Sequence, residues 1–146
     1  MKEIKVYLAG AMSGITFGEM NTWRIELKEK LLMAAENAGY RITVINPVDY
    51  YNFAERRHQS EKEIKEFDLA HVTSSDIIIV NLDKLSGSDG TKYEMFKANY
   101  CHKIPVIAFG DKQLYDSLHP WTQDDITRVE KNPIDVVNYI RDFYMV

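Results

Sequence analysis

The sequence predicts an α/β domain of three layers, in which helices cover both faces of a five-stranded, mostly parallel sheet. The first observation is that short apolar runs alternate with longer amphipathic segments along the chain. The second is the run DIIIVNL at 76–82, which is apolar without alternation, as expected of a parallel strand buried on both faces. The length of 146 residues predicts a single domain over 1–146.

The first half of the chain predicts a strand, a helix and a second strand. The segment IKVYLAG at 4–10 is apolar, ends in glycine and predicts the first strand. Residues 19–38 carry apolar side chains at helical spacing, and Gly39 suits the C-cap of that helix. The segment YRITVINP at 40–47 predicts the second strand, which Pro47 stops. The polar and aromatic stretch that follows has weak periodicity and is predicted to be a loop.

The second half continues the alternation. Ser60 and Glu63 have the spacing of a capping box, which predicts a helix that runs to about Thr73. The order of elements, with right-handed crossovers, is typical of flavodoxin-like and Rossmann-like folds. The remaining predicted elements are strands at 76–82, 103–110 and 126–130, a helix at 91–101, and a helix at 132–144 with Asn132 as N-cap and Pro133 at its first position.

Composition excludes several classes of function. The net charge of −4 and a pI of about 5.6 argue against a protein that binds a nucleic-acid backbone. No apolar run approaches the roughly 18 residues that a membrane span requires, and the N-terminus has no signal-peptide layout. Cys101, the single cysteine, has apolar neighbours and is expected in the core; the lack of a disulfide partner favours the cytoplasm. The four histidines have no metal-binding spacing, so neither a metal nor another cofactor is expected.

Ligands of such folds bind beyond the carboxyl ends of the strands, so the loops at those ends are the functional candidates. These loops begin with AGAMSG, NPVDYY, DKLSGSDGT and GDKQ. The glycines match neither the GxGxxG fingerprint nor the Walker A pattern. The two glycine-bearing loops are therefore either tight turns or cradles that present backbone N–H groups to an anion.

Carboxylates are the chemically useful groups in this part of the chain. Glu94 falls near the start of a predicted helix, where the helix dipole favours the ionised form. Asp68 precedes the third strand and can reach the same crevice. Taken singly, each is more readily a capping or solvated residue than a catalytic one, and the same holds for Asp49, Asp83 and Asp89. Two carboxylates over one cleft would suit the cleavage of a glycosidic bond.

Three segments together resemble the nucleoside 2-deoxyribosyltransferase family, whose superfamily also contains nucleoside 5′-monophosphate N-glycosidases. They are KVYLAG, EFDLAHVTSSDIIIVNLD and SGSDGTKYEMFKANYCHKIPVIAF, and the resemblance covers about residues 4–110. It implies that Glu94 is the nucleophile and that Asp68 is the general acid and base for the nucleobase. Tyr7 would hydrogen-bond and orient the nucleophile.

The resemblance implies a function and a set of partners. The enzyme would cleave the N-glycosidic bond of a (deoxy)nucleoside with retention, through a covalent glycosyl–Glu94 intermediate, and transfer the sugar to another free base. Its partners would be a nucleoside or nucleotide and a nucleobase, and it would assemble as a homodimer or higher oligomer. The residues expected to bind substrate are Gly10, Ala11, Met12, Ser13, Asp49, Ser88, Asp89, Gly90 and Thr91.

The chain departs from the transferase pattern at one position. Ser88 stands where transferases of free nucleosides have an aspartate, and a serine there contacts the phosphate in the monophosphate hydrolases. Against a phosphate, Asp89 would repel a dianion, and Ser13 replaces the arginine that those hydrolases use. A transferase or a glycosidase that acts on free nucleosides is therefore favoured. Hydrolysis of a 5′-monophosphate and a non-catalytic nucleotide-binding module remain the alternatives.

Overall fold

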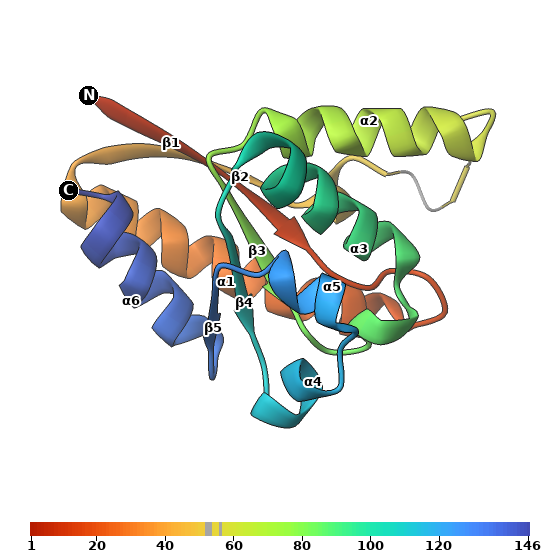
Figure 1. The fold of residues 1–146 in the computed structure, drawn as a ribbon. Helices are drawn as coiled ribbons and strands as arrows, with labels where there is room; N and C mark the ends of the chain where they lie inside the picture. Colours follow the sequence, from red (N-terminus) through yellow and green to blue (C-terminus); the bar gives the residue numbers. More distant parts are fainter. Residues whose placement is uncertain (52–53, 56) are drawn as a thin grey trace.

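A five-stranded parallel sheet forms the centre of the computed structural model, which describes residues 1–51, 54–55 and 57–146 (Figure 1). The strand order is β2-β1-β3-β4-β5, and every neighbouring pair runs parallel. This is the flavodoxin-like order, with the topological switch between β1 and β3. The predicted fold class is confirmed. The strands are β1 (Lys2–Ala9), β2 (Tyr40–Ile45), β3 (Ile77–Asn81), β4 (Val106–Phe109) and β5 (Arg128–Glu130).

Helices cover both faces of the sheet (Figure 1). α1 and α6 lie side by side on one face, and α2 and α3 cover the other. The helices are α1 (Phe17–Ala38), α2 (Glu61–Thr73), α3 (Asp89–Met95), α4 (Lys112–Asp116), α5 (Pro120–Asp124) and α6 (Pro133–Tyr144); 3₁₀ turns span Pro47–Asp49 (η1) and Leu85–Gly87 (η2), and a π-helix spans Phe96–Cys101 (η3).

Local capping signals explain where the long helices begin and end. Gly39 ends α1 with a φ of 74°, in the left-handed region that glycine adopts without strain. Ser60 starts α2 through the predicted capping box, and Asn132 caps α6. A second capping box, formed by Thr16 and Glu19, starts α1 two residues before the predicted helix. Capping chemistry therefore sets these ends more sharply than hydrophobic spacing does.

Other predicted boundaries need correction. The helix predicted at 91–101 begins at Asp89, and its last six residues are the π-helix η3. Strand β4 is shorter than predicted because Lys103 adopts a left-handed turn with a φ of 58°. Cys101 is exposed, although its apolar neighbours suggested a place in the core. The predicted loop after β2 begins with η1 and includes 52–53 and 56, which lie outside the described residues.

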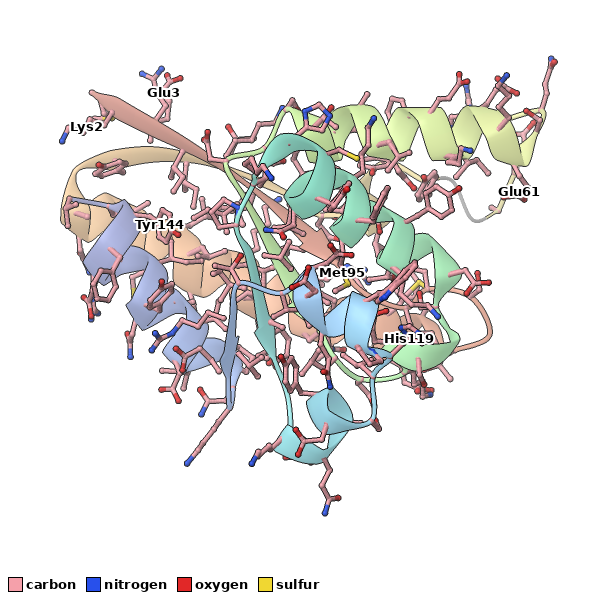
Figure 2. The ribbon with its side chains drawn as sticks, viewed as in Figure 1. Lys2, Glu3, Glu61, Met95, His119 and Tyr144 are labelled. Atoms are coloured by element: carbon pink, nitrogen blue, oxygen red, sulfur yellow. The ribbon has the colours of Figure 1, made fainter. Side chains whose placement is uncertain are left out.

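Each face of the sheet has its own hydrophobic core. Alternation along β1 directs Val6 and Leu8 toward α1 and α6, and Tyr7 and Ala9 toward α2 and α3. Met95, labelled in Figure 2, anchors α3 in the second core and is fully buried. The two cores hold the carboxyl ends of β1 and β3 at the same edge of the sheet. Within the described residues, no helix is long and apolar enough to cross a membrane.

Candidate functional site

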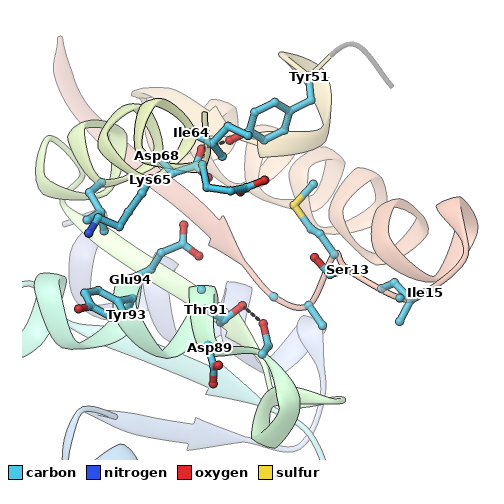
Figure 3. Close-up of a pocket in the computed structure, with 18 of the residues that line it drawn as sticks. Ser13, Ile15, Tyr51, Ile64, Lys65, Asp68, Asp89, Thr91, Tyr93 and Glu94 are labelled. Atoms are coloured by element: carbon cyan, nitrogen blue, oxygen red, sulfur yellow. Dashed lines mark hydrogen bonds between the residues drawn. The ribbon is translucent and has the colours of Figure 1, made fainter. Parts of the chain in front are cut away.

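A pocket of about 1300 Å³ lies at the carboxyl ends of β1 and β3, where the strand order switches (Figure 3). Its walls are the loop after β1, the segment after η1, the first turns of α2, and the loop that leads into α3. Ligands of open α/β sheets bind at this position. The volume is sufficient for a nucleoside or nucleotide.

Ten of the twelve residues predicted from the sequence line this pocket. Tyr7 lies beneath it and contacts Glu94, whereas Asp49 lies elsewhere. The glycine-bearing loops thus meet at one place, as the order of strands requires. The ten lining residues are Gly10, Ala11, Met12, Ser13, Asp68, Ser88, Asp89, Gly90, Thr91 and Glu94.

Glu94 lies at the floor of the pocket, and Tyr7 holds it from beneath. Tyr7 is 1% exposed on β1, and its hydroxyl donates a hydrogen bond to Oε2 of Glu94 on α3. Burial and the adjacent Glu94 raise the pKa of Tyr7 far above its usual range, so the phenol keeps its proton. The nucleophile predicted from the sequence is thus oriented by a side chain of a buried strand.

The protonation of Glu94 differs from the expectation. Glu94 is the sixth residue of α3, and the helix dipole acts mainly within the first turn. Burial raises the pKa of Glu94 to about 8, and the charge of Asp68 acts in the same direction. The Tyr7 hydroxyl and the charge of Arg24 lower the pKa but do not outweigh burial. The helix N-terminus was expected to favour the ionised form of Glu94, whereas burial in the folded protein acts against that form.

Asp68 faces Glu94 across the pocket from α2 (Figure 3). Its Oδ1 accepts hydrogen bonds from the hydroxyls of Tyr50 at 2.8 Å and Tyr51 at 2.5 Å. Its Oδ2 accepts none from the described side chains and backbone, which leaves this oxygen for a ligand. Burial raises the pKa of both tyrosines above their usual range, so both remain donors.

Tyr50 and Tyr51 are site residues that the sequence reasoning missed. Their segment, NPVDYY, was among the candidate loops, but neither tyrosine was selected as a site residue. Tyr50 packs edge-on against Phe67 with centroids 5.1 Å apart, and it stacks on His71 at 5.2 Å. The available signal was their place directly after the carboxyl end of β2, beside Asp68 in space.

The loop into α3 supplies hydroxyls and backbone groups. The Ser88 and Thr91 hydroxyls lie 2.7 Å apart and hydrogen-bond to each other (Figure 3). Asp89, also in this loop, pairs with Lys92 at 3.4 Å, and its side chain is 96% exposed. The pairing with Lys92 reduces the repulsion that Asp89 would exert on an anion in the pocket.

Two cationic residues of the pocket wall were also missed. Arg57 and Lys65 line it, and neither forms an ion pair with a described residue. Lys65 lies over the ring of Tyr93, with its Nζ 5.4 Å from the centroid. Arg57 follows the NPVDYY stretch in the loop after β2 and Lys65 lies on α2, so pattern reasoning selected neither. Among the described residues, no cluster of three His, Cys, Asp or Glu could hold a metal ion.

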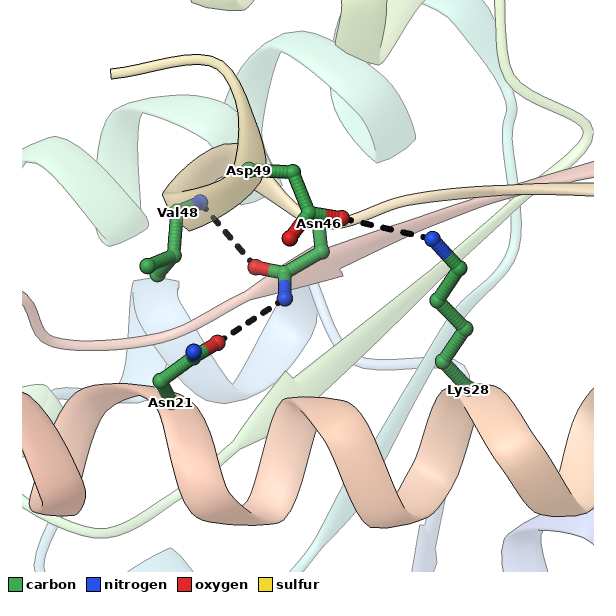
Figure 4. A network of polar contacts seen from close by, with 5 residues as sticks. All are labelled: Asn21, Lys28, Asn46, Val48 and Asp49. Atoms are coloured by element: carbon green, nitrogen blue, oxygen red, sulfur yellow. Dashed lines mark hydrogen bonds and ion pairs between the residues drawn. The ribbon is translucent and has the colours of Figure 1, made fainter. Parts of the chain in front are cut away.

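Asp49 is the predicted substrate-binding residue that the fold directs elsewhere. It belongs to η1, and its carboxylate pairs with Lys28 of α1 at 3.3 Å (Figure 4). Asn46 caps this turn by accepting from the Val48 N–H, and it donates to Asn21 of α1. These contacts tie η1 to α1, and Asp49 does not line the pocket.

Comparison with known proteins identifies the fold. No known family model matches the chain, and no curated protein matches it. A conserved protein from Enterococcus faecalis is similar with a TM-score of 0.75 and 18% identity, covering 96% of this chain and 98% of that chain. A CMP N-glycosidase from Clostridium botulinum is similar with a TM-score of 0.53 and 19% identity, covering 96% and 98%.

A 2-deoxyribosyltransferase from Bacillus psychrosaccharolyticus is similar with a TM-score of 0.51 and 20% identity, covering 92% of this chain and 91% of that chain. The chain thus shares its fold with an enzyme of each of these two activities. At these identities the likeness establishes the fold alone. The chemistry must be argued from the residues in the pocket.

Proposed function

We propose that this protein cleaves the N-glycosidic bond of a (deoxy)nucleoside and transfers the sugar to another nucleobase. One observation carries the proposal: a pocket at the topological switch point holds Glu94, oriented by Tyr7, opposite Asp68. A module that only binds a ligand has no need for a carboxylate such as Glu94 that a buried hydroxyl orients toward the pocket. It also has no need for a second carboxylate such as Asp68 on the opposite side. The fold shared with a 2-deoxyribosyltransferase supports the same proposal.

The first half-reaction breaks the bond between C1′ and the base nitrogen. The carboxylate of Glu94 attacks C1′ through an oxocarbenium-like transition state and forms a glycosyl ester. The bonding electrons go to the departing base, which Asp68 protonates or shares a proton with. Tyr7 donates to Oε2 of Glu94, which leaves Oε1 as the attacking oxygen.

The second half-reaction releases Glu94. A second base attacks C1′, the ester bond breaks, and Asp68 accepts the proton that the incoming nitrogen loses. Two displacements at C1′ retain its configuration. Because Glu94 must be ionised to attack, its pKa of about 8 makes the free enzyme depend on pH. The reactive fraction of the free enzyme rises as the pH rises toward 8.

Hydrolysis of a nucleoside 5′-monophosphate is the second candidate, because specific residues favour it. Arg57 and Lys65 bring two cations without described ion pairs to the wall, and Ser88 offers a hydroxyl on the α3 side. Both kinds of group bind phosphate oxygens. The pairing of Asp89 with Lys92 weakens the argument against a phosphate. The fold shared with a CMP N-glycosidase points the same way.

Two incubations of the purified protein, read by chromatography, test the proposal. One offers a panel of deoxynucleosides with a different free base as acceptor. The other offers the matching 5′-monophosphates without an acceptor. Base exchange in the first incubation supports the transferase, and base release from monophosphates alone supports the hydrolase. Silence in both, with ligand binding by calorimetry, overturns both and leaves a binding module.

Variants connect the activity to the pocket. Glu94→Ala abolishes exchange or release if Glu94 is the nucleophile. Glu36→Gln is the matched control, because it removes an exposed carboxylate of α1 that does not line the pocket. Activity that survives in Glu94→Ala would come from a contaminant or from different chemistry, and the mechanism would be withdrawn.

A further inference from the structure

Arg24 of α1 is a buried cation beneath the pocket that the proposed mechanism does not use. The residue is 1% exposed, and no carboxylate of the described residues lies within ion-pair distance of it. Burial lowers the pKa of Arg24 to about 10, which still leaves it charged at neutral pH. A buried charge without a counter-ion is costly, so its environment must compensate it.

Main-chain carbonyls supply this compensation. Nε of Arg24 donates to Leu8 O at 3.3 Å, Nη2 to Gly10 O at 3.1 Å and Nη1 to Met20 O at 2.5 Å. The guanidinium also lies 4.5 Å from the centroid of the Trp23 ring. The planar fork of donors therefore joins the end of β1 to the first turn of α1.

The loop after β1 packs tightly on this pair of side chains. A Cβ at Gly10 would lie 2.7 Å from Cζ2 of Trp23 and 3.4 Å from Nη2 of Arg24. Gly10 itself lines the pocket and opens the loop that carries Ser13. The start of this loop thus packs directly against Trp23 and Arg24, with no room for a larger residue than glycine.

Arg24 is connected through β1 to the nucleophile proposed above, because it binds the carbonyls of Leu8 and Gly10 and the neighbouring Tyr7 donates to Glu94. Four charged or titratable groups act on Glu94: Tyr7 from β1, Asp68 from α2, Tyr51 from the segment after η1, and Arg24 from α1. Asp68 favours the protonated form of Glu94, whereas the Tyr7 hydroxyl and Arg24 favour the carboxylate. Arg24 is the cation among these four groups.

We propose that Arg24 is a positioning residue, which fixes the loop after β1 and places a buried positive charge behind the strand whose Tyr7 holds Glu94. Its effect on turnover rests on the function proposed above. Its effects on the loop and on Glu94 are properties of the unliganded protein. A substitution that removes the charge and one that keeps it therefore separate the two roles.

The test follows the Glu94 carboxyl by ¹³C NMR during a pH titration, with its signal assigned by its absence in Glu94→Gln. In Arg24→Gln, which keeps an amide donor without charge, we expect the pKa of Glu94 to rise by about one unit. In Arg24→Lys, which keeps the charge, the pKa stays near the wild-type value. Arg41→Gln is the control, because Arg41 is exposed and pairs with Glu3. An unchanged titration in Arg24→Gln overturns the electrostatic role.

Amide hydrogen exchange of residues 11–14 tests the positioning role. A lysine cannot bridge three carbonyls as a planar fork, so exchange in this loop becomes faster in Arg24→Lys than in wild type. Unchanged exchange overturns this role. If Arg24→Gln does not fold, hydrogen exchange in Arg24→Lys still tests the positioning role.

Kinetics supply a third readout. If the enzyme is active, the pH at which kcat/KM falls on the acid side of its pH profile is higher in Arg24→Gln than in wild type, in step with the Glu94 signal. A profile whose acid side does not move overturns the link to catalysis. Because the NMR and exchange measurements need no substrate, failure of the proposed function and failure of this inference give different results.

Discussion

The two carboxylates of the pocket come from neighbouring helices but are held by different parts of the molecule. Glu94 on α3 is bound by Tyr7, a buried residue of β1 in the middle of the sheet. Asp68 on α2 is bound by Tyr50 and Tyr51, which follow η1 at the edge of the pocket. One carboxylate is thus tied to the rigid sheet, and the other to a connecting segment.

The different anchoring of Glu94 and Asp68 fits their different roles in the proposed reaction. Attack on C1′ is sensitive to the position of the nucleophile, and strands hold side chains more rigidly than loops do. The acid must serve bases of different shape, one leaving and one arriving, and a loop-borne anchor adapts more easily. The contrast predicts that changes on the Glu94 side are more damaging than matching changes on the Asp68 side.

The largest effect is expected for Glu94→Gln. Removal of the nucleophile prevents the glycosyl ester, so base exchange falls by about 10⁴-fold or more. Intact-mass spectrometry after a rapid quench with substrate detects the ester in wild type and not in the variant. A sugar adduct on Glu94→Gln would place the nucleophile elsewhere.

Asp68→Asn is expected to have the next largest effect. It lowers the rate of base cleavage from ordinary nucleosides by about 10²- to 10⁴-fold, which is the usual contribution of a general acid. The loss depends on the leaving group. A 7-methylated deoxyguanosine carries its positive charge already and leaves without protonation, so the variant regains most of its cleavage rate on it. Glu94→Gln regains none. Equal loss on both substrates would mean that Asp68 holds structure rather than moves a proton.

Tyr7→Phe has an intermediate effect. The hydrogen bond to Glu94 is charge-assisted once Glu94 ionises, and its loss reduces kcat by about 10- to 100-fold. The Tyr7 hydroxyl lowers the pKa of Glu94, so its removal moves the pKa above about 8 and shifts the acid limb of the pH profile upward. A reduced rate with an unmoved limb would show that Tyr7 orients Glu94 without changing its charge.

The fold was accessible from the sequence because its signals are local. Apolar runs located the five strands, and the caps at Gly39, Ser60 and Asn132 are all present. The failures arose where backbone geometry outweighs the pattern. The π-helix η3 and the turn at Lys103 have no signature that periodicity detects.

The candidate site was accessible for a different reason: parallel strands bring their carboxyl ends to one edge. This rule placed the loop that leads to Glu94 at the pocket, whereas Asp68, which lies on α2, was selected by the family resemblance. Asp49 also follows a strand end but pairs with Lys28 of α1 and does not line the pocket, which depends on the orientation of α1. The tyrosine anchors of Asp68 and the burial of Glu94 are tertiary properties, which no local pattern contains.

Single changes at Tyr50 or Tyr51 are expected to be mild. Both hydroxyls donate to the same oxygen of Asp68, so Tyr50→Phe or Tyr51→Phe alone leaves one donor and lowers kcat/KM by about two- to five-fold. The double variant loses more than the product of the two single effects, because Asp68 then has no tyrosine donor. Strictly multiplicative losses would show that the two hydroxyls act independently.

The smallest effect is on stability, and its sign follows from the burial of Glu94. Its pKa is about 8 in the folded protein and 4.5 ordinarily, so the folded state binds this proton more tightly than the unfolded state does. The stability that this supplies is fully present below pH 4.5 and is lost as the pH rises through 8. Glu94→Gln cannot lose it. We therefore expect the Tm of Glu94→Gln to rise steadily relative to that of wild type between pH 5 and pH 9, whereas Glu36→Gln shows no such trend. A constant difference across this range would mean that water reaches Glu94 freely and that the floor of the pocket is less enclosed than its contacts with Tyr7 imply.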